Sequence, residues 1–194
     1  MSVSTPVKLS LLFVFLIAVA GIVLAVAFNG PDETRKYRAQ LIGGKTGDIN
    51  AEQLSAEPHR VVPEMLSTVY LAFGETDEAT IYDKLAEVSA HDALETLYLE
   101  RLGAMVGGGL DKADQTLHEM ELKGLTSKRA GTTFTMNVKW RVVGTVGHAT
   151  HLHVRGNTYS ANLTIEPVND AWRMTAFDLT DVDRTDAGTR VAAE

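Results

Sequence analysis

The feature that most constrains the fold is a change of period in the second half of the chain. Between Thr132 and Val142, one residue in two is apolar and its neighbours are polar. A period of two predicts a strand with one buried and one solvated face. Three more strands are predicted on the same grounds, at about 114–126, 148–167 and 172–181. The predicted connections are Lys128–Gly131, Gly144–Gly147 and Asn169–Asp170.

The stretch before these strands follows a helical period instead. Apolar residues from Val61 to Phe73 recur at three- and four-residue spacing, which predicts a helix that ends at Gly74. A second helix is expected after Thr76 and Asp77, which are good N-caps. A third is expected after Ser89, which begins a capping-box pattern. Three helices followed by four antiparallel strands predict an α+β domain over residues 58–183, with a curved, cone-like sheet packed on the helices.

The first part of the chain is apolar rather than amphipathic. Leu9 to Phe28 contains no charged residue and is long enough, as a helix, to cross the roughly 30 Å hydrocarbon core of a bilayer. This predicts a transmembrane anchor at 9–28 that binds the lipid bilayer, after a short tail at 1–8. A cleaved signal peptide is the alternative, because Ala25-Val26-Ala27 fits a cleavage site after Ala27. The length of the apolar run favours the uncleaved anchor.

The remaining segments complete the predicted organisation. Residues 29–57 contain Asn29-Gly30-Pro31 and a glycine-rich run, and they are predicted to be a stalk. Residues 184–194 are predicted to be a flexible tail. Positive charges lie on both sides of the apolar run, and the long domain that follows favours export. We therefore expect a single-pass protein of a bacterial inner membrane, with its C-terminal domain in the periplasm.

Composition excludes several classes of protein. The formal net charge is −7 and no basic cluster is present beyond Arg35–Arg38, so nucleic acid is not an expected partner. The chain has no cysteine, which excludes disulfides, thiolate catalysis and zinc–cysteine sites. The absence of cysteine also excludes a lipid-modified cysteine as a membrane anchor.

Two stretches carry a resemblance to known proteins. The first consists of three segments, Tyr70–Phe73, Asp77–Ala86 and Leu97–Leu99. The second is Gly147-His148-Ala149-Thr150-His151-Leu152-His153-Val154-Arg155-Gly156-Asn157-Thr158-Tyr159. Both resemble a group of bacterial membrane-anchored proteins with a G-H-x-x-H-x-H-x-R-x-N-x-Y run. The order of elements is similar to the nuclear-transport-factor-2-like (SnoaL-like) fold. The resemblance implies a shared fold over about 58–183 and no particular activity.

The histidine-containing run is the candidate site. On a regular strand, one face would carry His151, His153, Arg155, Asn157 and Tyr159. Arginine, asparagine and tyrosine side chains supply donors for a small anionic ligand. His148, His151 and His153 could instead hold a divalent metal, although Arg155 on the same face opposes a dication. A solvated hydrogen-bond ladder, or a face covered by a partner protein, is the plainest interpretation.

The sequence favours a non-enzymatic function. It contains no nucleophile elbow, zinc-protease helix, Rossmann glycine pattern or calcium loop. The leading hypothesis is an accessory or binding protein of a membrane-associated assembly, with no cofactor. One alternative is a metal-binding protein that uses the histidines. The other is a lyase- or isomerase-like enzyme, with His151 or His153 as a base beside Asp178.

Overall fold

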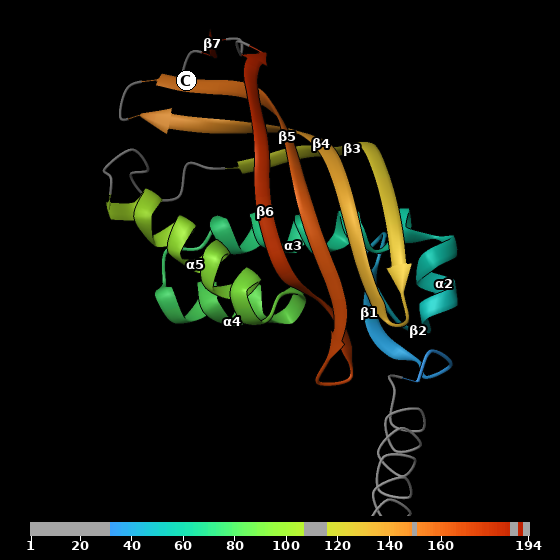
Figure 1. Cartoon of the computed structure of the whole chain (residues 1–194). Helices are drawn as coiled ribbons and strands as arrows, with labels where there is room; N and C mark the ends of the chain where they lie inside the picture. Colours follow the sequence, from blue (N-terminus) through green and yellow to red (C-terminus); the bar gives the residue numbers. More distant parts are fainter. Residues whose placement is uncertain (1–31, 107–115, 149–150, 187–189, 192–194) are drawn as a thin grey trace, which may run out of the picture. The chain divides into compact units, whose positions relative to one another are not determined.

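The computed structural model of the chain describes residues 32–106, 116–148, 151–186 and 190–191 (Figure 1). At several strand ends that border the gaps, only the backbone is described. The chain divides into two compact units, Met1–Asp32 and Glu33–Glu194. The second unit is the folded domain discussed below.

The domain is built on a mixed β-sheet whose strand order is β2-β1-β6-β5-β4-β3. The two short strands are β1 (Tyr37–Leu41) and β2 (Lys45–Ile49). The long strands are β3 (Thr116–Ala130), β4 (Thr133–His148), β5 (His151–Val168) and β6 (Ala171–Asp186). A two-residue strand, β7 (Arg190–Val191), also pairs with β5. Strand β1 pairs with β6 in parallel, whereas the other pairings are antiparallel.

Tight turns set the register of the hairpins. Asn169 and Asp170 both have positive φ and close the β5–β6 hairpin directly between Val168 and Ala171. Two consecutive residues in this conformation match the right-handed twist of the strands that they join. Gly43 and Gly44 also have positive φ, in the turn between β1 and β2. A glycine adopts this conformation without the steric cost that a Cβ would add.

The helices precede the long strands in the chain. They are α2 (Ala51–Ala56), the short 3₁₀ helix η1 (Pro58–Arg60), α3 (Val62–Phe73), α4 (Glu78–Val88) and α5 (His91–Val106). Asp77 caps α4 by accepting a hydrogen bond from the backbone N–H of Thr80, and Asn50 caps α2 through a capping box. Ser89 does not open α5 as predicted, because its hydroxyl donates to the carbonyl of Leu85 at the end of α4.

One core lies between the helices and one face of the sheet (Figure 1). The predicted alternation along β4 is confirmed: Phe134, Met136 and Val138 are buried, whereas Thr135 and Asn137 are exposed. The buried set packs against apolar side chains of α3, α4 and α5. The long strands β3 to β6 curve across these helices in Figure 1.

The predicted fold class is wrong in its sheet. We expected four antiparallel strands, but β1 and β2 extend the sheet and make it mixed. Both strands, with α2, lie in the region predicted to be a stalk (29–57). They fold onto the domain because Tyr37 packs edge-on against Trp172 and the Trp172 indole donates to the Ile49 carbonyl at 3.0 Å. The sheet is therefore larger than the SnoaL-like layout expected from the order of elements.

Two more expectations need correction. The segment Gly144–Gly147 is not a turn, because β4 continues through it and pairs with β5 as far as His148 and His151. The predicted fold class also included a transmembrane helix at Leu9–Phe28, which lies outside the described residues. Among the residues that are described, no helix is both long and apolar enough to cross a membrane.

Candidate functional site

The predicted histidine row begins where β4 ends and β5 starts, and it continues along β5 to Tyr159. The backbone pairs His148 with His151 and places His153 opposite Val146, with Arg155 opposite Gly144. The side chains of these three histidines and of Arg155 lie outside the described part of the structure. The metal site predicted for His148, His151 and His153 therefore stays a prediction. In the ranges that the structure does describe, no group of three potential metal ligands comes together.

The other end of the row, Asn157 and Tyr159, faces the helices. These residues lie opposite Val142 and Trp140, both on the buried face of β4. The amide of Asn157 donates to the hydroxyl of Tyr159 at 3.1 Å. The ring of Tyr159 stacks on Trp140, with centroids 5.6 Å apart and planes 20° from parallel. Asn157 and Tyr159 are thus half-buried, on the face of the sheet that carries the core.

Tyr159 lines a cleft of about 360 Å³ between the sheet and two helices. A volume of this size suits a small organic molecule. The lining comes from α3, α5 and strands β4 to β6: Leu66, Val69, Tyr70, Phe73, Thr96, Leu97, Glu100, Arg101, Ala104, Trp140, Tyr159, Phe177, Leu179 and Arg184. We call this feature the aromatic cleft, because five of these side chains are aromatic.

The rings of the aromatic cleft hold one another in place. Tyr70 on α3 lies 6.4 Å from both Phe73 and Tyr159, measured between ring centroids, and Trp140 lies 6.5 Å from Phe177. The Trp140 indole N–H donates to the Tyr70 hydroxyl at 3.0 Å. Burial raises the pKa of Tyr70 well above its usual value, so its hydroxyl stays neutral. The cleft therefore offers fixed ring faces rather than a titrating acid or base at Tyr70.

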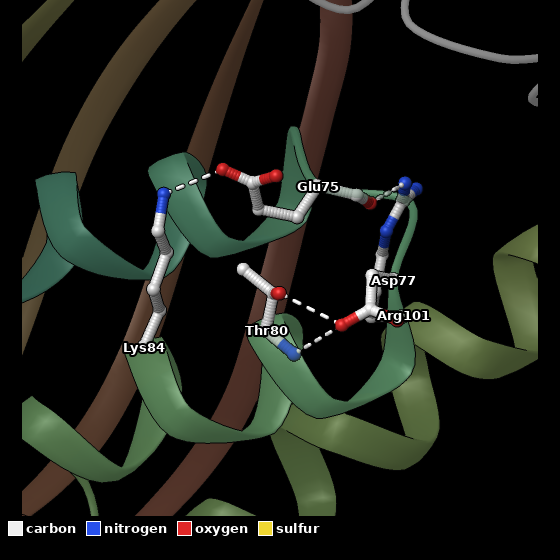
Figure 2. Close-up of polar contacts among 5 residues, drawn as sticks. All are labelled: Glu75, Asp77, Thr80, Lys84 and Arg101. Carbon is white, nitrogen blue, oxygen red and sulfur yellow. Dashed lines mark hydrogen bonds and ion pairs between the residues drawn. The ribbon is translucent and has the colours of Figure 1, made fainter.

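Arg101 on α5 is the buried charge of this cleft. Only 6% of the residue is exposed, and its Nη2 donates to the backbone carbonyl of Glu75 at 2.7 Å. The carboxylate of Glu75 points away from Arg101 (Figure 2), and it forms an ion pair with Nζ of Lys84 at 2.5 Å. The Nε of Arg101 is buried and has no hydrogen-bond partner. Burial lowers the pKa of the guanidinium, which is the sign expected for a desolvated cation.

The sequence places Arg101 in this position through helical spacing. Ala93, Leu97, Arg101 and Ala104 recur at three- and four-residue intervals, so all four lie on one stripe of α5. Ala93 and Leu97 are buried in the core, and Arg101 follows them onto the same inner side. The loop between α3 and α4 places the Glu75 carbonyl within hydrogen-bond distance of Arg101 (Figure 2). Asp77, two residues further on, caps the start of α4. An arginine in an apolar stripe is the pattern that sequence reasoning could have noticed and did not.

Two further charges line the cleft, Glu100 and Arg184, and both are exposed. The described lining thus carries two arginines and one glutamate, a net positive charge in a chain whose formal net charge is −7. Aromatic faces beside an arginine suit a ligand with a flat apolar body and an anionic group.

A second hollow of about 350 Å³ lies where β1, α4 and β6 meet. It is polar, and Gln40 connects Thr68 and Glu87 through hydrogen bonds of 2.7 and 3.1 Å. Arg173 lines it with a buried Nε that also has no partner, but this residue lies directly opposite Glu166 on β5. A carboxylate directly opposite on a neighbouring strand is a favourable neighbour for an arginine. The aromatic cleft is therefore the stronger candidate site.

Comparison with known proteins gives little beyond these observations. No family model matches the sequence, and no curated protein matches it. Among solved structures, the domain is similar to the intermembrane space region of the chloroplast protein ARC6. The TM-score is 0.42 and the identity 18%, over 68% of this chain and 96% of that one. A de novo designed β-sheet protein has a TM-score of 0.28 and 16% identity, over 68% of this chain and 87% of that one. Likenesses this loose carry no argument about function.

Proposed function

We propose that the domain is a non-catalytic binding domain whose aromatic cleft holds a small, largely apolar ligand. The observation that carries this proposal is the cleft of about 360 Å³ between α3, α5 and the sheet, with five aromatic side chains in its lining. Ligand sites are characteristically concave and mostly apolar, with a few fixed polar groups. Here the polar groups away from the exposed rim are Arg101 and the hydroxyls of Tyr70 and Tyr159, whereas Thr96, Glu100 and Arg184 are exposed.

The chemistry of the lining favours binding over catalysis. The Tyr70 hydroxyl already accepts from Trp140, and its raised pKa keeps it protonated. The Tyr159 hydroxyl accepts from Asn157, and the Arg101 guanidinium is held by the Glu75 carbonyl. A general base should accept a proton near neutral pH. Tyrosine and arginine side chains in these surroundings are ill suited to that task, but they are well suited to orienting a ligand.

The accessory role in a larger assembly, expected from the sequence, agrees with binding without catalysis. A protein partner and a place outside the cytoplasm remain predictions. Co-purification after mild extraction tests the first of them: an intact chain that runs alone as a monomer would argue against an assembly.

Filling the cleft tests the binding function. Ala104 lies on the lining of the cleft and is partly exposed, so Ala104→Trp places an indole in the cavity without replacing a core residue. We expect the neutral dye phenylnaphthylamine to bind the full-length protein and to fluoresce more strongly there. Ala104→Trp should weaken this binding by about tenfold or more, because the ring would occupy the volume of the ligand.

A matched control separates cleft filling from a general effect of tryptophan. Ala79 is exposed on α4 and is not part of the cleft lining, so Ala79→Trp should bind the dye as the parent does. Thermal unfolding of both variants confirms that each is folded. Equal dye binding by Ala104→Trp and the parent protein would contradict the proposal.

A further inference from the structure

Arg101 is a cation that the described residues bury without a carboxylate to balance it. A buried charge is costly unless it is paired and hydrogen-bonded. The Glu75 carbonyl takes one N–H group of Arg101, but the Glu75 carboxylate is committed to Lys84 (Figure 2). The buried Nε takes no partner at all.

The surroundings of Arg101 define what would balance it. On one side the cleft presents the apolar faces of Leu97, Phe73 and Tyr70. On β6 it presents a second cation, Arg184. An anion with two oxygens can accept from two N–H groups of one guanidinium at once, and such charge-assisted hydrogen bonds are strong. A fully hydrophilic anion would leave the aromatic rings uncovered, whereas a neutral apolar ligand would leave Arg101 unbalanced.

We propose that the ligand of the aromatic cleft is a small amphipathic anion, with its acid group on Arg101 and its apolar body against Tyr70, Trp140 and Tyr159. This inference rests on the proposed binding function and names the chemical class of the ligand. A carboxylate, sulfonate or phosphate monoester on an aromatic or short aliphatic body satisfies it. Arg101 supplies the selectivity for charge, and the rings supply most of the apolar contact area.

A pair of dyes that differ only in the acid group tests this directly. Anilinonaphthalene sulfonate and phenylnaphthylamine share one ring system, and only the first carries a sulfonate. Both are titrated into the full-length protein, with the Ala104→Trp chain as the blank for dye bound elsewhere. Arg101→Met keeps a long apolar side chain but removes the charge and the donors. We expect it to weaken sulfonate binding by about tenfold or more and to change binding of the neutral dye less than about twofold.

Two variants guard the interpretation. Arg101→Lys keeps the charge but not the planar fork, and it should recover part of the sulfonate affinity. Arg60→Met removes an exposed arginine that is not in the cleft lining, and it should leave both dyes unaffected. Arg101→Met loses the bond to Glu75, so a lower melting temperature is expected. Retained binding of the neutral dye shows that its cleft is intact.

The two proposals fail in different ways. If the neutral dye binds the parent in the cleft but Arg101→Met weakens both dyes equally, Arg101 is a structural residue and the anion inference is overturned. The same holds if Arg101→Met leaves sulfonate binding unchanged. If neither dye binds in a manner that Ala104→Trp blocks, the binding function itself is wrong.

Discussion

The hydrogen bond from the Trp140 indole to the Tyr70 hydroxyl joins α3 to β4 at the wall of the aromatic cleft. Trp140 is only 2% exposed, so its N–H group is largely shielded from solvent. Tyr70→Phe keeps the ring and its contacts with Phe73 and Tyr159, but it removes the acceptor. The substitution therefore isolates the cost of one buried donor that loses its partner.

The magnitude follows from that burial. A buried donor without a partner costs about 1–3 kcal/mol, and the cleft beside Tyr70 allows some access of water, which favours the lower part of this range. We expect Tyr70→Phe to lower the free energy of unfolding by about 1–2 kcal/mol. In a domain of this size, each kcal/mol corresponds to a fall in Tm of about 2–4 °C. Urea unfolding followed by circular dichroism measures the change, provided that the slope with urea is unaltered.

A double-mutant cycle with Trp140→Phe identifies the source of the loss. Without the indole N–H, Tyr70→Phe should cost less than in the parent, which gives a coupling energy of about 1 kcal/mol. Tyr82→Phe is the matched control, because Tyr82 is 46% exposed and its substitution should change stability by less than about 0.5 kcal/mol. A Tyr70→Phe effect no larger than that of Tyr82→Phe, or a strictly additive cycle, would refute the reasoning.

Five further outcomes are expected. Asp77→Ala should destabilise the protein at neutral pH, because Asp77 caps α4 and its bonds with Thr80 lower its pKa. This contribution is present above the unfolded pKa of about 3.9 and is lost as pH falls through the lower folded value, so melting curves of variant and parent should converge in acid. Gly44→Ala should cost about 1–2 kcal/mol, since φ is +71° there. Gly103→Ala, inside α5 with open space around it, should instead stabilise by about 0.5–1 kcal/mol; urea unfolding that gave the same sign for both would contradict this. A chain that begins at Lys45 should fail to show cooperative unfolding, because it lacks Tyr37 and Ala39 of the core, whereas one that begins at Asp32 should unfold cooperatively. If the histidine row binds metal, elemental analysis should find a transition metal in the parent and none in His151→Ala/His153→Ala; a metal-free parent would end that hypothesis.

Local patterns gave the central elements of the fold. The helical period from Val61 to Phe73 predicts α3, and the Asp77 cap predicts the start of α4. The alternation along 132–142 predicts β4. These elements are predictable because neighbouring residues decide them, through spacing and capping. The Asn169-Asp170 turn is predictable for the same reason, since these residue types tolerate positive φ.

Long-range contacts decided what the sequence did not show. Strands β1 and β2 are five residues each and carry too little pattern to stand out in a glycine-containing segment. They become strands because β6 offers an edge and Trp172 offers a ring and an N–H donor, 123 residues beyond Ile49. The candidate site changed for a similar reason. The sequence pointed to a row of five residues, but of the described side chains in that row only Tyr159 lines the cleft, with Asn157 hydrogen-bonded to it.

The sequence by itself determined that this chain has a helical part followed by long strands with one apolar face. It also determined that the chain has no cysteine and a formal net charge of −7. Only the tertiary structure decided that the sheet is mixed, that its inner side leaves a cleft, and that Arg101 lies there beside Tyr70 and Trp140. The physical reason is the distance along the sequence over which the deciding interactions act. Periodicity and capping act within a few turns of one chain segment, whereas a cleft exists only where surfaces from distant segments fail to fill the space between them.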